Sequence, residues 1–359
     1  MAPPSPKQAR AAGLTRPDLS DRGLEVLRAV VRDYIDSAEP VGSKHLVEGV
    51  GLSASPATIR AVMADLEQLG YLAKPHASAG RVPTPKAFRF YVDTFLEAEP
   101  LPDAAKVAVR RAYQPPRGSV DELMAQTGRI LSRLTHHAAV VAAPLLSRAV
   151  YRQIRFVKLR EDRVLAILVS ESGMVQNRVL VLEEEMSQEE LDRATTLLDE
   201  HFGALTLTEV RVRLREALAR DEAARDALER RAMELAEAAV DGTEERADED
   251  LIVSGQEALL AAPEFATREK LQEVLELIAR REQLLRVLEQ AEGSQGIQIY
   301  IGTESEFGGE DLSLVVTTYQ RGGQVLGALG VIGPTRMDYG RVVASVRYTA
   351  AHLSRAFDA

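Results

Sequence analysis

The stretch SASPATIRAVMADLEQLGYL, residues 53–72, predicts one capped amphipathic helix. Ser55 can accept a hydrogen bond from the first turn as a side-chain N-cap, and Pro56 occupies the first helical position, where a missing N–H costs nothing. Gly70 supplies the left-handed residue that commonly ends a helix. The sequence therefore predicts a helix of about fourteen residues, a usual length in globular proteins.

The two faces of this helix differ in character. A step of about 100° per residue puts five apolar residues on a core face: Ile59, Val62, Met63, Leu66 and Leu69. The opposite face carries Ala57, Arg60, Ala61, Ala64 and Gln68. The alanines leave that face almost flat, so its backbone could approach base edges in a major groove while Arg60 and Gln68 supply hydrogen-bond donors. The alternative is an ordinary surface helix rich in alanine, and this helix alone favours neither interpretation.

The residues before this helix favour DNA binding. Ser20 can cap a helix that must end before Pro40. A second short helix is expected at about 43–48, and Gly49 and Gly51 make the turn into the third helix. The apolar residues of the first helix recur at helical spacing: Leu24, Leu27, Val30, Val31 and Ile35. Helix, short helix, turn and helix is the order of a helix-turn-helix motif.

The residues after the helix predict a hairpin wing. Residues 71–74 are typical of a strand, and residues 76–81 form a small-residue loop with basic ends. A hairpin of this composition can lie along DNA, with Lys74 and Arg81 on phosphates. The alternative is a plain surface hairpin, and a histidine in such a loop, here His76, is more often a solvated side chain than a base reader.

Short motifs along the chain resemble the family of heat-inducible transcription repressors named HrcA. In the N-terminal part they are EPVGS (39–43), ATIR (57–60), LGYL (69–72), PH (75–76), SAGR (78–81) and YVD (91–93). Near the C-terminus, GVIGPTRMDY (330–339) is similar to the closing signature of that family. The resemblance therefore covers nearly the whole chain.

The resemblance implies a multidomain α+β fold. Its parts would be an N-terminal winged helix-turn-helix, a GAF-like α+β sheet domain and an inserted helical dimerisation domain. It also implies a homodimeric repressor of heat-shock chaperone operons, which binds an inverted-repeat operator called CIRCE and is kept active by the chaperonin GroEL. Two residues depart from the family, because Ala61 stands where Asn is usual and Ala77 where Thr is usual. Asn can pair with adenine whereas Ala can only touch a thymine methyl, so base preference at residue 61 is expected to differ.

The predicted contacts with double-stranded DNA divide by role. Arg60 is expected to read bases directly, with Gln68 as the second reader. Ala57 and Ala61 would allow close approach and methyl contact. The other members of the predicted interface are His76 and Ser78 in the loop and five residues that would mainly position the phosphate backbone, Ser43, Ser55, Thr58, Lys74 and Arg81.

The charge distribution suits local attraction to DNA. The 359 residues are 45% hydrophobic, enough for packed cores, and carry a net charge of −10. Residues 1–96 contain 12 Lys and Arg against 10 Asp and Glu, whereas residues 97–359 contain 32 Lys and Arg against 44 Asp and Glu. Because salt screens charges beyond about 8 Å, DNA binding depends on the nearby patch. The lack of cysteine excludes disulfides, thiolate metal sites and cysteine nucleophiles.

The sequence is typical of a cytoplasmic protein without membrane segments. It begins with the proline-rich MAPPSP and lacks the apolar region of a secretory signal, so a disordered tail is expected at 1–13. The longest uncharged apolar run, about 138–146, is far below the roughly 20 residues that span a bilayer.

After a DNA-binding domain at 14–98, the patterns predict one sheet domain with an insertion. Helices are expected at 86–96, 120–135, 188–202 and 339–356, and strands at 154–159, 164–169, 174–182, 297–301, 312–319 and 325–332. A long segment of different character separates the two groups of strands. The predicted GAF-like domain therefore comprises 99–204 and 294–359, interrupted by 205–293.

The predicted insertion is rich in Ala, Glu, Arg and Leu. Five apolar residues fall at heptad-like spacing: Leu271, Val274, Ile278, Leu285 and Leu288. Arg281 occupies a d position between them, so the seam is imperfect. A helical hairpin that caps the sheet and a dimerisation arm fit this periodicity equally well, and the resemblance favours the arm.

No arrangement of residues for catalysis or cofactor binding emerges. The six histidines show no His-x3-His spacing, and neither GxxxxGK[ST] nor GxSxG is present. We therefore expect no enzyme activity, no metal and no cofactor. Two other functions stay open: a regulator that senses a small molecule in the GAF-like domain, and a non-DNA adaptor whose winged helix binds protein.

Overall fold

The fold is a mixture of helices and antiparallel sheets in a computed structural model. Its described residues are 19–76, 79–97, 100–113, 120–144, 150–171, 175–182, 184–203, 205–219, 227–241, 251–294, 296–305, 307 and 309–358. The predicted tail at 1–13 lies outside these residues, as do Ala77 and Ser78 of the predicted wing. The mixed α+β class that the sequence predicts is confirmed.

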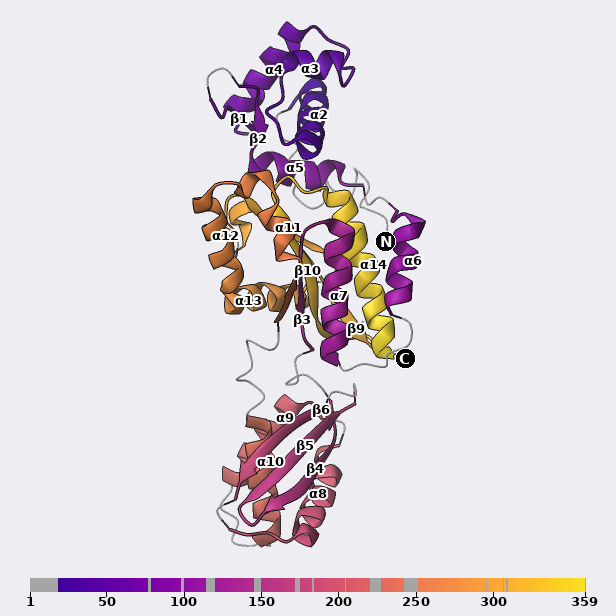
Figure 1. Cartoon of the computed structure of the whole chain (residues 1–359), viewed down its shortest axis with the longest axis vertical. Helices are drawn as coiled ribbons and strands as arrows, with labels where there is room; N and C mark the ends of the chain where they lie inside the picture. The colour runs from indigo at the N-terminus through magenta and orange to yellow at the C-terminus, as the bar shows by residue number, and fades with distance from the viewer. Residues whose placement is uncertain are drawn as a thin grey trace.

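The N-terminal unit is a group of helices with one short hairpin, at one end of the long axis (Figure 1). Ser20 caps the first helix by accepting the Gly23 N–H at 3.1 Å, as its sequence predicts. The hairpin pairs Leu72 with Pro83. The elements are α2 (Asp21–Ser37), α3 (Ser43–Glu48), α4 (Pro56–Gln68), β1 (Leu72–Ala73), β2 (Val82–Pro83) and α5 (Pro85–Phe95).

A five-stranded antiparallel sheet forms the middle of the molecule, in the order β7-β3-β10-β9-β8. The strands are β3 (Ala138–Ala142), β7 (Leu251–Ser254), β8 (Gln298–Ile301), β9 (Leu312–Arg321) and β10 (Gln324–Pro334). The surrounding helices are α6 (Asp103–Ala112), α7 (Val120–Thr135), α11 (Gln256–Leu260), η3 (Pro263–Phe265), α12 (Arg268–Ala279), α13 (Arg281–Glu292), η4 (Gly302–Glu304) and α14 (Tyr339–Asp358).

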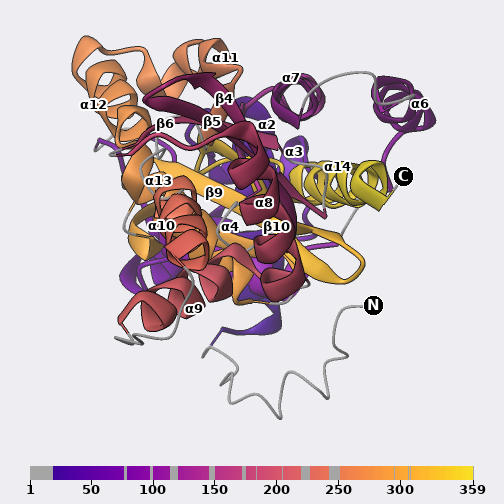
Figure 2. The same ribbon diagram turned by 90° about the horizontal axis from the view of Figure 1, so that it is seen from below.

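Both faces of this central sheet are buried. In β9, Val315 belongs to the core shared with α7 and α14, whereas its neighbours Leu314 and Val316 belong to the core shared with α12 and α13. Successive residues of a strand point to opposite faces, so each face needs its own apolar set. Seen along the long axis, α7 and α14 lie to one side of β9 and β10, and α12 and α13 lie to the other (Figure 2).

A distal unit contains a separate three-stranded sheet, in the order β4-β5-β6. Helices α8 and α10 pack on one face of this sheet, and the buried residues of this core all lie within 151–240. A Ser187–Glu190 capping box starts α8. The elements are β4 (Tyr151–Arg160), β5 (Arg163–Ser170), β6 (Val175–Val181), α8 (Gln188–Phe202), α9 (Leu207–Ala219) and α10 (Ala227–Asp241).

The prediction that both groups of strands share one sheet is therefore wrong. Among the described strands, β4, β5 and β6 pair only with one another, so the segment that interrupts the central domain includes them and not 268–292. All six predicted strands are present, whereas β3 and β7 were not predicted, and periodicity does not specify the partner strand. The choice of partner depends on which apolar faces meet in three dimensions.

The proposed seam at 271–288 also needs correction. Val274, Ile278 and Leu288 are 3%, 5% and 0% exposed, in the core against the chain's own central sheet. The chain breaks at Arg280 (φ −78°, ψ 62°) into two helices, so no continuous coiled-coil helix forms. Of the five seam residues, Leu271 and Leu285 remain partly exposed. The capping hairpin, which the sequence left open, is the arrangement that the structure adopts.

Within the described ranges, every helix is too short or too polar to cross a membrane. In the same ranges, no group of three or more His, Asp or Glu side chains is placed to hold a metal ion.

His137, at the start of β3, is predicted to make stability depend on pH. Its burial, together with the nearby Arg336 guanidinium, lowers the pKa of the imidazole to about 4. The unfolded chain would bind a proton near pH 6.5 whereas the folded chain would not, so the free energy of unfolding falls as pH drops from about 6.5 to 4, by up to about 1.4 kcal/mol per pH unit. Urea unfolding at pH 7.5, 5.5 and 4.5 measures this loss. His137→Gln should reduce the slope relative to the exposed control His201→Gln, and equal slopes would contradict the assignment.

Candidate nucleic-acid interface

Helix α4 is fixed by its first turn and by its buried face. Ser55 Oγ accepts the Thr58 N–H at 3.1 Å and lies 2.8 Å from the Thr58 hydroxyl, and Pro56 begins the helix. Gly70 follows it with a φ of 77°. The helix packs on α2 and α3. Its buried residues are Ile59, Met63 and Leu66.

The opposite face of α4 is open to solvent. Ala57, Arg60, Ala61 and Gln68 are all exposed. Neither Arg60 nor Gln68 makes a side-chain hydrogen bond or ion pair with any described residue. Leu69, predicted in the core, is 43% exposed because it is the C-cap residue and no longer follows the helical face. The result is a flat surface with two available hydrogen-bonding side chains.

Ser43 and Arg81 have internal positions, which corrects the prediction that their side chains contact phosphates. The Arg81 Nε–H donates to Glu67 Oε2 at 2.9 Å, and the Arg81 side chain is 12% exposed. The Arg81 backbone also exchanges two hydrogen bonds of 2.9 Å with Val41. Ser43 is 7% exposed at the start of α3. The contacts of Arg81 hold the hairpin against α4 and against Val41, which precedes α3.

The hairpin presents two of the predicted side chains. Lys74 and His76 are exposed, while Ser78 lies outside the described residues. Gly80 allows the loop to return closely, because a Cβ there would lie 2.6 Å from the Pro40 carbonyl oxygen. A side chain at residue 80 would therefore push the hairpin away from the chain that precedes α3.

Lys86 supports α4 and is a residue that the sequence patterns do not reveal. Its Nζ donates to the Leu69 carbonyl oxygen at 2.8 Å and lies 4.5 Å from the centroid of the Tyr71 ring. A cation at a helix C-terminus is favourable, and so is its position over an aromatic face. Because this contact joins residues 17 apart in two different helices, no helical or strand periodicity marks it.

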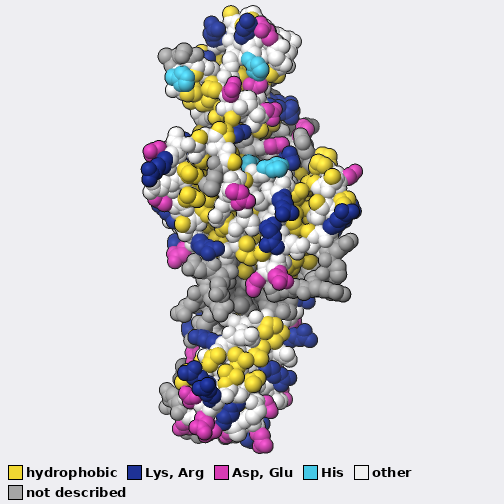
Figure 3. All heavy atoms as spheres, in the orientation of Figure 1, with side chains coloured by type: hydrophobic (Ala, Val, Ile, Leu, Met, Phe, Trp, Pro, Cys, Tyr) yellow, Lys and Arg dark blue, Asp and Glu magenta, His cyan; other side chains and the backbone are white. Residues whose placement is uncertain are grey.

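None of the described helices covers the second face of the distal sheet, and this uncovered face forms a second candidate surface. Val157, Leu165 and Val179 are paired across β4, β5 and β6, so their side chains form a row on this face. Val157 is 41% exposed and Val179 is 49% exposed. Figure 3 shows hydrophobic side chains gathered on the distal unit, with Lys and Arg around them. Other exposed apolar residues of these strands are Leu159, Val175 and Val181.

Comparison with known proteins agrees with a repressor of this architecture. Residues 121–343 match the family described as HrcA protein C terminal domain. Two proteins named heat-inducible transcription repressor HrcA align over most of their length. The one from Geobacter sulfurreducens is 40% identical over 94% of this chain and 98% of its own, and the one from Anaeromyxobacter sp. strain K is 42% identical over 95% and 97%.

A solved structure has the same overall fold. It is a crystal structure described as that of a hypothetical protein, and it covers 95% of this chain and 99% of its own. The TM-score is 0.61 and the sequence identity is 25%.

Proposed function

Since the chain belongs to the HrcA family of heat-inducible transcription repressors, we propose that it is a homodimeric repressor that binds an inverted-repeat operator, the CIRCE element, of heat-shock chaperone operons. The exposed, alanine-lined face of α4 with its unpaired Arg60 carries this proposal. In it, α2, α3, α4 and the β1–β2 hairpin act as a winged helix-turn-helix. Two such units would occupy two half-sites, so that the operator mirrors the symmetry of the dimer.

In this proposal, α4 enters the major groove with Ala57 and Ala61 against the base edges. Arg60 would donate to acceptors on guanine, the commonest specific arginine contact, and Gln68 would be the second reader. Ser55 and Thr58 at the start of the helix, and Lys74 and His76 on the hairpin, would contact the DNA backbone. Arg81 would act indirectly, since its ion pair with Glu67 joins the hairpin to α4.

Arg60→Ala and Lys74→Ala are expected to weaken DNA binding in different ways. Loss of the base contact at residue 60 should cost about 1–3 kcal/mol on the operator and relax specificity, whereas loss of the phosphate contact at residue 74 should weaken all duplexes alike and flatten the dependence on salt. Titration of operator and scrambled duplexes at several salt concentrations measures both. Equal loss on the two duplexes for Arg60→Ala would remove it from base readout. If the unaltered protein failed to prefer the operator, the proposed function itself would be wrong.

The dimer is proposed to form through the uncovered face of the distal sheet. This face replaces the helical seam at 271–288, whose central residues are buried within the chain. An antiparallel sheet with one apolar solvent face is an interaction surface, because isolated domains rarely leave such a row uncovered. A second copy of the chain would supply the same apolar row, as a two-fold interface requires.

Chaperonin dependence completes the proposal and rests on the family resemblance. If the DNA-competent state is slow to form, the supply of GroEL would set its population. Full operator affinity of the purified protein after repeated heating and cooling without chaperonin would contradict this part alone.

A further inference from the structure

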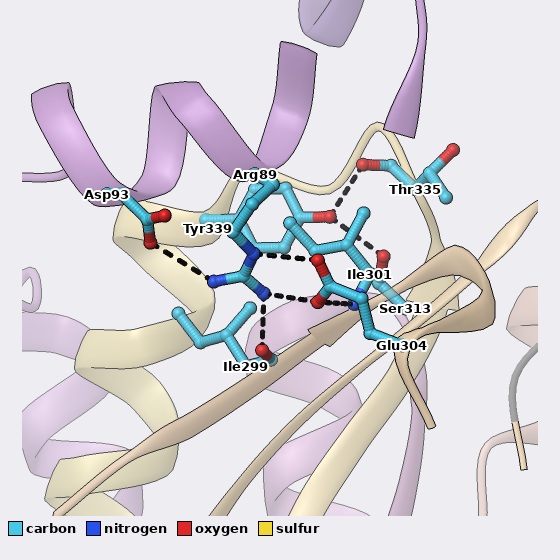
Figure 4. Close-up of polar contacts among 8 residues, drawn as sticks. All are labelled: Arg89, Asp93, Ile299, Ile301, Glu304, Ser313, Thr335 and Tyr339. Carbon is cyan, nitrogen blue, oxygen red and sulfur yellow. Dashed lines mark hydrogen bonds and ion pairs between the residues drawn. The ribbon is translucent and has the colours of Figure 1, made fainter. Parts of the chain in front are cut away.

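An arginine of α5 joins the N-terminal unit to the central sheet (Figure 4). The Arg89 Nε–H donates to Glu304 Oε1 at 2.9 Å, and one terminal nitrogen donates to Glu304 Oε2 at 2.6 Å. That nitrogen also donates to the Ile299 carbonyl oxygen at 2.5 Å, and the other terminal nitrogen donates to Asp93 at 3.2 Å. The paired arrangement fixes the orientation of the guanidinium as well as its position.

The acceptor of this contact is itself held in place. Glu304 Oε2 accepts the Ile301 N–H at 2.9 Å, so its carboxylate cannot turn without breaking a backbone contact at the end of β8. Beside it, the Tyr339 hydroxyl donates to the Thr335 carbonyl oxygen at 2.7 Å and lies 2.8 Å from the Ser313 hydroxyl. In Figure 4 the contacts of Arg89 and Glu304 therefore join α5 to β8 and η4, and the neighbouring contacts of Tyr339 join the start of α14 to β9.

A second arginine makes an independent connection. One terminal nitrogen of Arg336 donates to the Ile35 carbonyl oxygen at 3.0 Å, near the C-terminal end of α2. Its Nε–H donates to Glu264 of η3. The Arg336 and Glu264 side chains are 19% and 16% exposed, so solvent screens this pair less than a surface pair. A cation is favoured at the end of α2, where carbonyl groups lack helical partners.

Apolar packing continues between the two arginine contacts. The Phe88 ring lies 6.4 Å from the ring of Tyr34 and 6.4 Å from that of Tyr339. The core of the N-terminal unit and the core under α7 and α14 form one hydrophobic cluster. Arg89 and Arg336 therefore hold the DNA-binding unit at two separated points around a shared core. A different contact joins the central sheet to the distal unit, where a terminal nitrogen of Arg321 in β9 donates to the Glu171 carbonyl oxygen at 2.6 Å.

We infer that Arg89 and Arg336 are positioning residues that fix the orientation of the DNA-binding unit on the central sheet and thereby select one separation of operator half-sites. This inference rests on the proposed function. A DNA-binding unit that could rotate on the central sheet would still reach a half-site moved along the duplex, whereas a unit held in one orientation would not. One inserted base pair rotates the second half-site by roughly 35°, because a turn of DNA contains about 10 base pairs.

The first test measures orientation without DNA. The chain has no cysteine, so spin labels can be placed at Val50→Cys in the N-terminal unit and Leu275→Cys on α12, both exposed positions. Labelled chains diluted into unlabelled ones report distances within one chain. The distribution should be narrow in the parent protein and in the control Arg347→Ala, whose side chain is exposed on α14. It should broaden in the double variant Arg89→Ala, Arg336→Ala, and an equally narrow distribution would overturn the inference.

The second test measures spacing. Inserting one or two base pairs between half-sites should weaken binding by the parent protein at least about tenfold, and binding by the double variant by less than about threefold. Affinity for a single half-site should stay unchanged in the double variant, because neither arginine side chain hydrogen-bonds to a residue of α4. A variant that loses half-site affinity or retains the spacing penalty would overturn the positioning role. Glu304→Gln, which keeps the shape of the side chain, should give an intermediate penalty. If the parent protein bound no operator, the proposed function would fail while the distance measurement still tested the contact.

Discussion

Ala61→Glu is expected to abolish specific operator binding while leaving the protein folded. Ala61 is exposed on α4 beside Arg60 and takes no part in the core. A glutamate there would direct a carboxylate at base acceptors and phosphates, and the charge would be desolvated without a partner. A loss of at least about 3 kcal/mol, or more than a hundredfold in affinity, should follow.

The matched control is Ala351→Glu, an exposed alanine of α14 on the central domain. Both substitutions exchange one good helix former for another, so neither should alter the melting temperature by much. Operator titration at one fixed salt concentration compares them. Unchanged operator affinity for Ala61→Glu would mean that this face of α4 does not meet DNA.

If the proposed dimer forms through the distal sheet, Val179→Glu is expected to convert it into monomers. Val179 lies at the end of the row that includes Leu165 and Val157, with 49% of its surface exposed. In the proposed interface, one carboxylate from each chain would be buried without a partner, which costs several kcal/mol. A monomer can occupy only one half-site at a time, so operator affinity should fall more than about a hundredfold through the loss of the second contact.

Leu275→Glu is the control for this prediction, because Leu275 is 43% exposed on α12 beside the seam that the heptad spacing suggested. Sedimentation velocity gives the oligomeric state and titration gives the affinities for operator and half-site. Val179→Glu should change the oligomeric state and the operator affinity and leave the half-site affinity unchanged. If Leu275→Glu produced monomers and Val179→Glu did not, the interface would lie on the helices after all.

The position and ends of α4 could be predicted because their causes are local. Ser55, Pro56 and Gly70 act on backbone groups within one turn of themselves, and the buried residues of the helix follow from its period. The same reasoning placed Leu69 wrongly, since the period no longer applies at the C-cap. The exposure of Arg60 and Gln68 could likewise be predicted, because both residues lie on the opposite face of the helix.

Residues whose roles depend on distant partners could not be predicted in this way. A basic residue at the end of a wing suggests a phosphate contact, but Arg81 is paired with Glu67, fourteen positions earlier in the chain. Arg89 and Glu304 are 215 positions apart, and no pattern near either one identifies the other. Motif resemblance marked residues 330–339 as important, yet the contact of Arg336 with Ile35 appears only when the two segments are brought together.

The strands show most clearly where local information ends. Alternation of apolar residues correctly indicated strands near 154–182 and 297–332, and heptad spacing correctly indicated helices at 268–292. Both patterns report that one face of an element will be buried, without specifying what will bury it. Tertiary packing assigned the first strands to a sheet of their own and placed Val274, Ile278 and Leu288 on the central sheet instead of a second chain. The caps, the period and the exposed face of α4 were thus determined by neighbouring residues. Sheet membership, the uncovered distal face and the two arginine contacts arose instead from long-range packing, because its free energy is shared among segments that no short stretch of sequence contains.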